Sequence, residues 1–446
     1  MPTVTRKDEG ELMQLASSIH QAAANMTAFC EAEGLQQPSL SLAPDVPRSL
    51  QNAPYFEARD ALLAQAEQLV RLIRGPREHL ISLSLEHCAT ASLHVIMKYR
   101  LARHVPLKGT TTYAAIAKSV GKREMTAALV GRVLEHAATY DLFNVRSGGL
   151  VSHNITSSLL VMDPDLESWM ELNATVAYPA GAALVKALEM YGYSPESDEA
   201  PFGVAVGRKI TQFQHFREPD ADGKQYHEIF ARAMKGIGAE GSYDYQHVVD
   251  GGYPWHELER GGGHLVVDIG GGTGHVSVAL AKKYPKLRFE VQDLPETIAM
   301  GEELCPAALK DRIKFRANDF MTPQTPRQDV ENEGVAYFCR WILHDWSDKY
   351  ATKILQGLVS ALRPGDRIII NEFLLPEPGT ADRRRARRVH DNDILMLINL
   401  NGRERNVGTF EELGKSVTPQ LKVHRVHRLT QGELSIIEMV RCDSTL

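Results

Sequence analysis

The chain has 446 residues and a mass of 49.5 kDa, which predicts roughly two to three domains. Hydrophobic residues make up 43% of it and charged residues 24%, ordinary values that exclude a largely disordered, collagen-like or fibrous protein. The formal net charge is −6, so no overall basic field favours nucleic acid or an anionic membrane as the main partner.

The five cysteines are scattered and form no C-x-x-C pair. Their odd number argues against a disulfide framework, and the lack of H-E-x-x-H or paired cysteines predicts a protein that needs no metal. The N-terminus lacks the apolar core of a signal peptide, and no uninterrupted apolar run approaches the ~18 residues of a membrane span. We therefore expect a soluble, cytoplasmic protein without a membrane partner.

Helices come first in chain order. Residues 8–34 and 56–74 carry apolar residues at helical spacing, and a proline-rich linker separates them. Gly75 and Pro76 end the second helix. Residues 77–103 predict a third, mostly apolar helix, which suggests burial against a partner such as another chain.

Residues 111–157 have the rhythm of a winged helix. A short helix ends at Gly121, a second helix follows, and an alternating segment about Gly148 and Gly149 indicates a hairpin. Such a module either binds DNA or serves as a structural or dimerisation unit. Because the second helix mixes acidic with basic residues and the chain is acidic overall, we expect no nucleic-acid partner.

The pattern changes from helical to alternating along the second half of the chain. Residues 165–255 are helical and rich in aromatic side chains, which either line a pocket for a planar substrate or form ordinary core. From residue 264, β-branched runs alternate with helical stretches and predict a doubly wound, mostly parallel α/β sheet. The last two runs follow each other without a helix and predict a closing antiparallel hairpin. The runs are HLVVDI, LRFEVQ, IKFRA, VAYFC, RIIINEFLL, LKVHRV and LSIIEMVR.

A glycine-rich turn joins the strand at 264–269 to the following helix. The dinucleotide fingerprint needs glycine at position 275, where this chain has His275, and that counts against NAD. Asp268 and the alternating Gly270 and Gly272 instead suit a ligand with an amino-acid tail. The acid can hold an ammonium group, and the glycines leave room for a sulfonium-bearing chain.

Further polar residues follow the next strands. Asp293 lies about twenty residues past the glycine turn, where an acid can accept hydrogen bonds from two ribose hydroxyls. Asp319 and Phe320 follow the third strand, where an acid and a flat ring can grip an adenine. Because parallel strands present their carboxyl ends at one edge of the sheet, these residues predict a single ligand site.

His344 follows the fourth strand and is the candidate general base. A histidine at the carboxyl end of a strand points into the crevice, and its ordinary pKa near 6.5 lets it accept a proton at neutral pH. Glu372 on the fifth strand and Glu404 in a later loop are candidates to orient the ring and stabilise its charged form.

Together these motifs resemble the S-adenosylmethionine-dependent O-methyltransferases of the plant caffeic-acid type, and more closely their fungal polyketide and aromatic branch. The matching stretches are LVVDIGGGTGH, FEVQDLP, NDF, RWILHDWSDKYATKIL, LRPGDRIIINEFLLPEPG and NGRER. The likeness also covers PREHL, the winged helix and VDGGYPW, so it spans nearly the whole chain. It implies a class I methyltransferase Rossmann-like sheet that binds S-adenosyl-L-methionine.

The resemblance also implies the roles of single residues. His344 is the general base, with Glu372 and Glu404 flanking it. Arg340 stands where plant relatives usually have lysine, and Glu372 where fungal relatives often have aspartate. The residues expected at the cofactor are Asp268, Gly270, Gly272, Asp293, Asp319, Phe320 and Arg340.

The resemblance implies three parts of the chain: a helical and winged-helix dimerisation domain (1–165), a helical connector lining the substrate pocket (166–255) and a catalytic domain (256–446). We therefore expect a homodimeric enzyme that methylates a phenolic hydroxyl of an aromatic or polyketide secondary metabolite. The alternative is a methyltransferase-like pericyclase or dehydratase that uses the cofactor non-reactively, but the retained histidine and glutamates favour transfer. The arginine-rich residues 383–388 predict a solvated loop or helix start, with a phosphate-bearing partner as the alternative.

Overall fold

The chain folds into two compact units in the computed structural model. The first comprises residues 1–179 and 226–240, and the second comprises residues 180–225 and 241–446. The segment 166–255, expected from the sequence as one connector, is thus shared between the two units. The residues that the structure describes are 11–35, 37, 39, 53–219, 223, 225–238, 243–260, 263–326, 334–379, 383–429 and 432–444.

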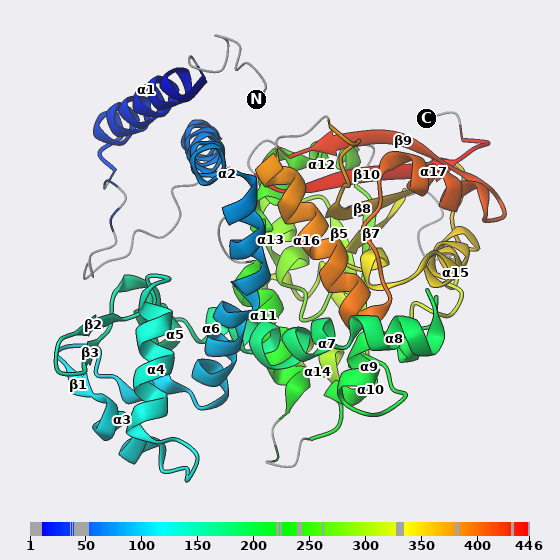
Figure 1. The fold of residues 1–446 in the computed structure, drawn as a ribbon. Helices are drawn as coiled ribbons and strands as arrows, with labels where there is room; N and C mark the ends of the chain where they lie inside the picture. Colours follow the sequence, from blue (N-terminus) through cyan, green and yellow to red (C-terminus); the bar gives the residue numbers. More distant parts are fainter. Residues whose placement is uncertain are drawn as a thin grey trace. The chain divides into compact units, whose positions relative to one another are not determined.

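The first unit is helical with one small sheet (Figure 1). The sequence places a helix end at Gly75 and Pro76, and the structure confirms a break there because Gly75 has φ 69° and ψ 167° inside α2. The elements of this unit are α1 (Glu11–Ala32), α2 (Ala53–Lys98), η1 (Leu101–His104), β1 (Thr111–Thr112), α3 (Tyr113–Val120), α4 (Ala127–Ala138), β2 (Asn144–Arg146), β3 (Leu150–Ser152), α5 (Ile155–Met162), α6 (Pro164–Leu172), η2 (Asn173–Ala177) and α11 (Tyr226–Ile237).

The predicted winged helix is confirmed. Thr112 and Thr126 cap the first turns of α3 and α4 with their side-chain oxygens, and Gly121 ends α3 in the left-handed conformation that glycine adopts without strain. The hairpin β2–β3 pairs antiparallel, with Val145 opposite Val151, and β1 adds a third strand. A buried cluster including Val151 holds the strands against α4.

The α2 helix carries an apolar face that neighbouring described residues leave exposed. Ile73 is 68% exposed and Leu80 is 66% exposed. Among the described residues one helix, Glu57–Lys98, is long and apolar enough to cross a membrane by length and composition alone, and a single helix of this kind is weak evidence for a span. Neighbouring exposed apolar residues on this helix are Leu63, Val70, Leu72, Ile81, Leu83 and Leu85.

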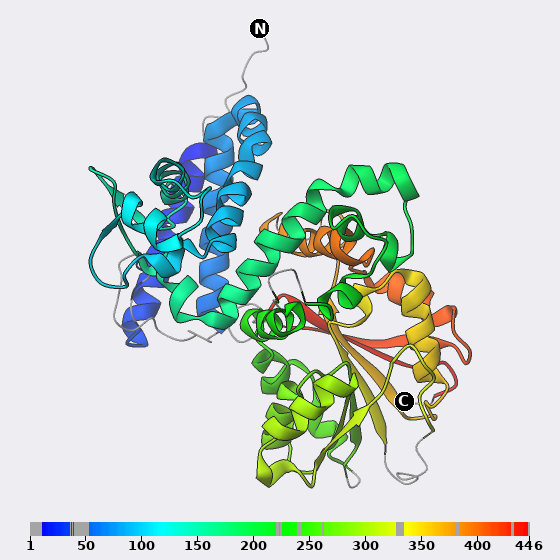
Figure 2. The same cartoon turned by 90° about the horizontal axis from the view of Figure 1, so that it is seen from below.

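The second unit is built on a seven-stranded sheet in the order β6-β5-β4-β7-β8-β10-β9 (Figures 1 and 2). Strands β6, β5, β4, β7 and β8 pair parallel, and β10 pairs antiparallel with both β8 and β9. Both the doubly wound sheet and the closing hairpin are therefore confirmed. The strands are β4 (Leu265–Ile269), β5 (Arg288–Asp293), β6 (Ile313–Ala317), β7 (Val335–Arg340), β8 (Arg367–Phe373), β9 (Leu421–Arg428) and β10 (Leu434–Arg441).

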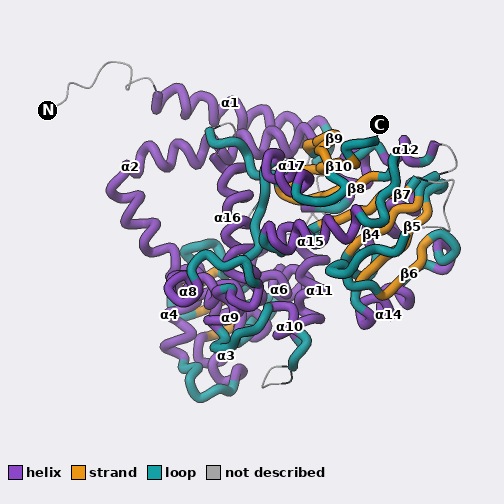
Figure 3. Tube along the Cα trace, turned by 90° about the vertical axis from the view of Figure 1, so that its right-hand side faces the viewer, coloured by secondary structure: helices purple, strands orange, loops and turns teal. Residues whose placement is uncertain are grey.

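Helices cover both faces of this sheet, as the purple helices around the orange strands in Figure 3 show. One face packs on α15 and α17, and the other packs on α12, α13 and α14. The helices and short turns of the unit are α8 (Leu184–Tyr191), η3 (Ser197–Glu199), α9 (Pro201–Ala205), α10 (Gln212–Phe216), η5 (Val248–Gly252), α12 (Trp255–Leu258), α13 (His275–Lys283), α14 (Pro295–Leu304), η7 (Ala307–Leu309), η9 (Leu343–Asp345), α15 (Asp348–Val359), α16 (Arg383–Leu400) and α17 (Val407–Lys415), while α7 (Tyr178–Ala182) spans the unit boundary.

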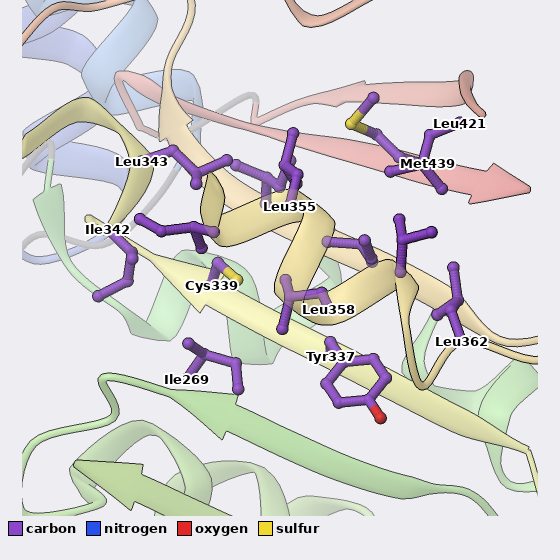
Figure 4. Close-up of a cluster of buried hydrophobic side chains, with 14 of the residues drawn as sticks. Ile269, Tyr337, Cys339, Ile342, Leu343, Leu355, Leu358, Leu362, Leu421 and Met439 are labelled. Atoms are coloured by element: carbon purple, nitrogen blue, oxygen red, sulfur yellow. The ribbon is translucent and has the colours of Figure 1, made fainter. Parts of the chain in front are cut away.

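Alternate residues of the central strand β4 pack into the two hydrophobic cores, one on each face of the sheet, as expected for a strand buried on both faces. Val267 and Ile269 of β4 lie in the core with α15, and Val266 lies in the core with α13. Figure 4 shows Ile269 in the first core near Tyr337 and Cys339 of β7. This packing fixes the carboxyl ends of β4 and β7 side by side, where the loops of the site begin.

The arginine-rich stretch begins α16, so a helix start is confirmed for residues 383–388. The stretch is not wholly solvated, because Arg388 and Arg385 form ion pairs with Glu433, which is 5% exposed at the start of β10. These arginines attach α16 to the sheet.

Candidate active site

The glycine turn after β4 depends on its glycines. Gly270 and Gly272 have φ values of 64° and 59°, a backbone conformation that residues other than glycine rarely adopt. A Cβ on Gly270 would lie 2.4 Å from Cδ1 of Ile342, so this turn packs closely against the segment that carries His344. At Gly272 a Cβ would meet no described atom within 4 Å, which leaves backbone accessible to a ligand.

Asp268 lies beneath the glycine turn and is 3% exposed. Its Oδ2 accepts a hydrogen bond of 2.6 Å from the Ser277 hydroxyl of α13. Burial raises the pKa of this carboxyl to about 6. The residue expected to hold a ligand ammonium therefore already has a partner within the fold.

Asp293 ends β5 and closes the glycine turn from the side. Its Oδ2 accepts the Gly272 backbone N–H at 2.8 Å, and its Oδ1 accepts the Leu294 N–H at 2.7 Å. Burial raises the pKa of the carboxyl, and these two hydrogen bonds oppose that rise. The sequence placed Asp293 at this edge, and the structure brings it to the turn itself.

Asp319 and Phe320 follow β6 as the strand order requires. The Asp319 carboxylate is exposed and accepts the Met321 N–H at 2.9 Å. The Phe320 ring lies 3.6 Å from the Cβ position of Gly270 and stands edge-on to the Trp346 ring at 6.1 Å. The flat ring expected at an adenine therefore lies beside the glycine turn, together with an indole that the sequence argument did not single out.

Arg340 ends β7 and is held among aromatic and acidic groups. Its Nη2 donates to the Tyr243 carbonyl at 2.9 Å, and its guanidinium carbon lies 3.9 Å from the Trp341 ring centre. Burial lowers the pKa of Arg340 to about 10, while the nearby Asp268 opposes that fall. Its Nε is buried without a hydrogen-bond partner among the described residues.

His344 lies in η9 just after β7 and is 7% exposed. Its Nδ1 lies 2.8 Å from Oε1 of Glu404, and its Nε2 lies 3.5 Å from Oδ1 of Asp345. Burial lowers the pKa of the imidazole, but the carboxylates of Glu404, Asp345 and Glu372 outweigh it and raise that pKa to about 10. The ring is thus held through Nδ1 by Glu404, and Nε2 faces the Asp345 carboxylate.

Glu372 acts on the backbone rather than on the ring. Its Oε1 accepts the N–H groups of Ile342 at 3.1 Å, Leu343 at 2.5 Å and His344 at 3.2 Å. From the sequence we expect this carboxylate beside the imidazole, as an orienter of the ring. In the structure it holds the turn from which His344 projects, and Glu404 contacts the ring.

Besides Trp346, three residues of this site are not predicted by the sequence motifs. Asp345 faces Nε2 of His344, and burial raises the pKa of its carboxyl to about 7. Arg405, 1% exposed, donates to the carbonyls of Leu343 at 2.8 Å and of Trp346 at 2.7 Å. A Cβ on Gly402 would lie 2.3 Å from the His344 carbonyl oxygen. The motif NGRER drew attention to its glutamate, but its glycine and second arginine position the same turn.

The described residues fit S-adenosylmethionine. The turn offers open space beside the Gly272 backbone, a carboxylate at its edge in Asp293 and a flat ring in Phe320, and Nε of Arg340 is a buried donor without a partner among the described residues. The glycine turn and the arginine suit an amino-acid tail, the carboxylate suits a ribose, and the ring suits an adenine. Among the described residues, no group of three or more His, Cys, Asp or Glu side chains is arranged to hold a metal ion.

Comparison with known proteins decides the family. Residues 259–417 match the model of an O-methyltransferase domain. The chain is 56% identical to the O-methyltransferase CTB2 of Cercospora beticola, over 97% of this chain and 94% of that protein. It belongs to the O-methyltransferase family. The enzyme is an S-adenosylmethionine-dependent O-methyltransferase of fungal secondary metabolism.

More distant likenesses extend over the whole length of this O-methyltransferase. It is 32% identical to the chlorophenol O-methyltransferase of Trichoderma longibrachiatum, over 98% of this chain and 91% of that protein. A solved structure described as a pericyclic reaction enzyme superposes with a TM-score of 0.70 at 20% identity, covering 96% of this chain and 99% of that one. At that identity the likeness shows a common fold and carries no conclusion about the reaction.

Proposed function

We propose that this enzyme methylates a phenolic hydroxyl of an aromatic or polyketide metabolite, with His344 as the general base. The observation that carries the proposal is the pair formed by His344 and Glu404, in which Nδ1 is held at 2.8 Å. That contact leaves Nε2 as the ring nitrogen that can take a proton from a substrate. A phenol with a pKa of ~10 is mostly neutral at pH 7, so a positioned base accelerates the reaction by roughly 10²–10⁴-fold. The relative named for chlorophenol supports this acceptor class.

The cofactor, when bound, supplies a methyl group that its sulfonium already activates. Nε2 of His344 takes the hydroxyl proton, and the Glu404 carboxylate stabilises the resulting imidazolium through Nδ1. Glu372 fixes the turn through three backbone N–H groups. Because the methyl group needs no activation by the protein, the chief task of these residues is to orient the acceptor hydroxyl and take its proton.

We further propose roles for the residues that surround the cofactor. Asp293 accepts the ribose hydroxyls, Asp319 and Phe320 grip the adenine, and the glycine turn lies along the methionine part. Arg340, whose Nε is buried and unpartnered among the described residues, donates to the cofactor carboxylate. Asp268 supports the turn from below through Ser277.

Methyl transfer from radiolabelled S-adenosylmethionine into an extract of small phenolic metabolites tests the proposal. The native enzyme is expected to label an organic-extractable product, and His344→Ala is expected to lose at least about 100-fold in rate while it still binds the cofactor. His256→Ala, which changes an exposed histidine of the same unit, is the matched control.

Two outcomes contradict the proposal. Activity of His344→Ala within a few-fold of the native rate refutes the assignment of the base. A native enzyme that binds the cofactor but labels no product, and that converts a metabolite to an isomer of unchanged mass, points instead to the pericyclic reaction.

We also propose that the enzyme is a cytoplasmic homodimer in which a second copy covers the apolar face of α2. Ile73 and Leu80 are more than half exposed in the single chain, and an apolar surface of this kind is usual at an obligate interface. The helix is interrupted at Gly75, which disfavours an uninterrupted membrane span.

A further inference from the structure

A short segment from the middle of the chain reaches the turns that carry the base. Residues 194–199 lie between α8 and α9, about 70 residues before the first strand of the sheet, yet they belong to the same compact unit. Their contacts run to the His344 turn on one side and to the Glu404 loop on the other.

The backbone of this segment makes one contact with each catalytic turn. The Pro195 carbonyl accepts the Ser347 hydroxyl at 2.8 Å, three residues after His344. The Glu196 carbonyl accepts Nδ2 of Asn401 at 2.8 Å, three residues before Glu404. Asn401 has a φ of 52°, so a side-chain hydrogen bond helps to hold a conformation that is otherwise uncommon.

The side chain of Glu196 adds a third connection. Its Oε1 lies 2.6 Å from Nζ of Lys349, and its Oε2 accepts the Tyr350 hydroxyl at 2.6 Å. Both partners belong to the first turn of α15, directly after the His344 turn. The hydrogen bonds from Lys349 and Tyr350 lower the pKa of the Glu196 carboxyl, so this contact is between a carboxylate and its donors. Its side chain is 32% exposed.

The segment is itself fixed in place. The Ser194 hydroxyl donates to Oε2 of Glu199 at 2.5 Å and accepts the Glu196 N–H at 3.1 Å. Lys209 holds the other oxygen of Glu199 at 2.6 Å. A segment anchored in this way can transmit a constraint from one turn to the other.

The two turns also meet each other closely. The Arg403 N–H donates to the His344 carbonyl at 2.9 Å, and Gly402 leaves no room for a Cβ against that carbonyl. A displacement of one turn relative to the other therefore changes the distance between Nδ1 of His344 and Oε1 of Glu404. A misplacement of about 1 Å at a catalytic group can cost as much as ~10²-fold in rate.

We propose that Glu196 is a positioning residue of this enzyme, which ties the start of α15 to the loop of Asn401 and so keeps the base and its orienting carboxylate in register. The inference rests on the proposed function, since it concerns the same His344 and Glu404. Glu196 touches neither the imidazole nor the reacting atoms, and it acts through the two turns.

Hydrogen exchange and kinetics test this role together. In Glu196→Ala we expect faster amide exchange in peptides covering both 341–350 and 399–406, and a fall in kcat of about tenfold with the KM for S-adenosylmethionine unchanged within about twofold. Glu196→Gln keeps an oxygen for the Tyr350 hydroxyl and is expected to recover part of kcat. Glu303→Ala, an exposed glutamate on α14, is the matched control and should change neither measurement.

The outcomes separate this inference from the proposed function. Native-like exchange in both peptides, or faster exchange with an unchanged kcat, overturns the positioning role. A fall in kcat with a proportional loss of cofactor affinity also overturns it, because it indicates a general loss of structure. The native enzyme could transfer no methyl group while Glu196→Ala still shows faster exchange in both peptides. That result supports the positioning role of Glu196 and refutes only the methylation proposal.

Discussion

The imidazole of His344 is surrounded by negative charge. Glu404 contacts Nδ1, Asp345 faces Nε2 at 3.5 Å, and Glu372 lies behind the backbone of the same turn. Although burial lowers the pKa of the ring, these carboxylates raise it to about 10. In the free enzyme at neutral pH the ring is therefore mostly protonated, and one proton must leave before a neutral phenol can be activated.

This electrostatic setting makes the activity depend on pH. We expect kcat/KM of the native enzyme to rise by up to about tenfold per unit between pH 7 and 9. Asp345→Asn removes a negative charge that raises the pKa of His344, so that pKa falls and the plateau begins at a lower pH. The measurement is the pH profile of both enzymes with one acceptor, so that the pKa of the acceptor is common to both. Superimposable profiles would show that Asp345 does not control the base.

At this scale the sequence predicts which residues form the site better than it predicts the contacts that these residues make. Asp293, His344 and Glu404 lie where strand ends and motifs predicted them. The roles of Glu372 and Asp345 could not be predicted, because a strand position does not tell whether a carboxylate faces a ring or backbone N–H groups. Those contacts follow from the path of the 341–347 turn, which has no periodic signal.

At the scale of elements, the turn between β7 and α15 is held from two sides. Glu372 accepts its N–H groups, and Arg405 donates to its carbonyls at Leu343 and Trp346. The side chain of Arg405 is fully buried, and its Nε pairs with Asp348 at 2.9 Å. Besides the short internal hydrogen bonds of η9, five backbone groups of this turn are thus satisfied by the side chains of Glu372 and Arg405.

Arg405→Lys tests this arrangement. Lysine cannot satisfy two carbonyls and Asp348 in the same planar geometry, so we expect a loss of about 2–4 kcal/mol in the free energy of unfolding. Arg403→Lys changes the other arginine that pairs with Asp348, but it is 36% exposed and should cost less than about 1 kcal/mol. Urea titration of both variants gives the comparison, and equal losses would show that Arg405 has no special role in the turn.

Regular elements were the most predictable part of the chain. All seven strands of the large sheet lie within two residues of the runs chosen from the sequence. The inner strands are buried on both faces, which favours a continuous apolar run, whereas the edge strands β6 and β9 are partly exposed. The division into units was less predictable. Nothing in the pattern of residues 226–237 shows that α11 packs on α6, since contacts between distant segments depend on the tertiary fold.

At the scale of the whole molecule, the exposed apolar face of α2 predicts the state of assembly. We expect light scattering to give twice the mass of one chain for the native enzyme, and mostly the mass of one chain for Ile73→Glu combined with Leu80→Glu, because two charges would be buried without partners. Arg77→Glu places a negative charge at an exposed position of the same helix and is the control. A native mass of one chain would refute the dimer.

The first unit is formed by two separate stretches of the chain. The chain leaves the first unit after residue 179 and returns to it at residue 226. Asp165 of α6 forms ion pairs with Arg232 and Lys235 of α11, at 3.3 and 2.7 Å. A Cβ on Gly236 would lie 2.5 Å from the Asp165 backbone, so the two helices meet closely. During synthesis the first unit therefore stays incomplete until a portion of the second has left the ribosome. A fragment that stops at residue 179 carries an α6 whose partner helix has not yet been translated.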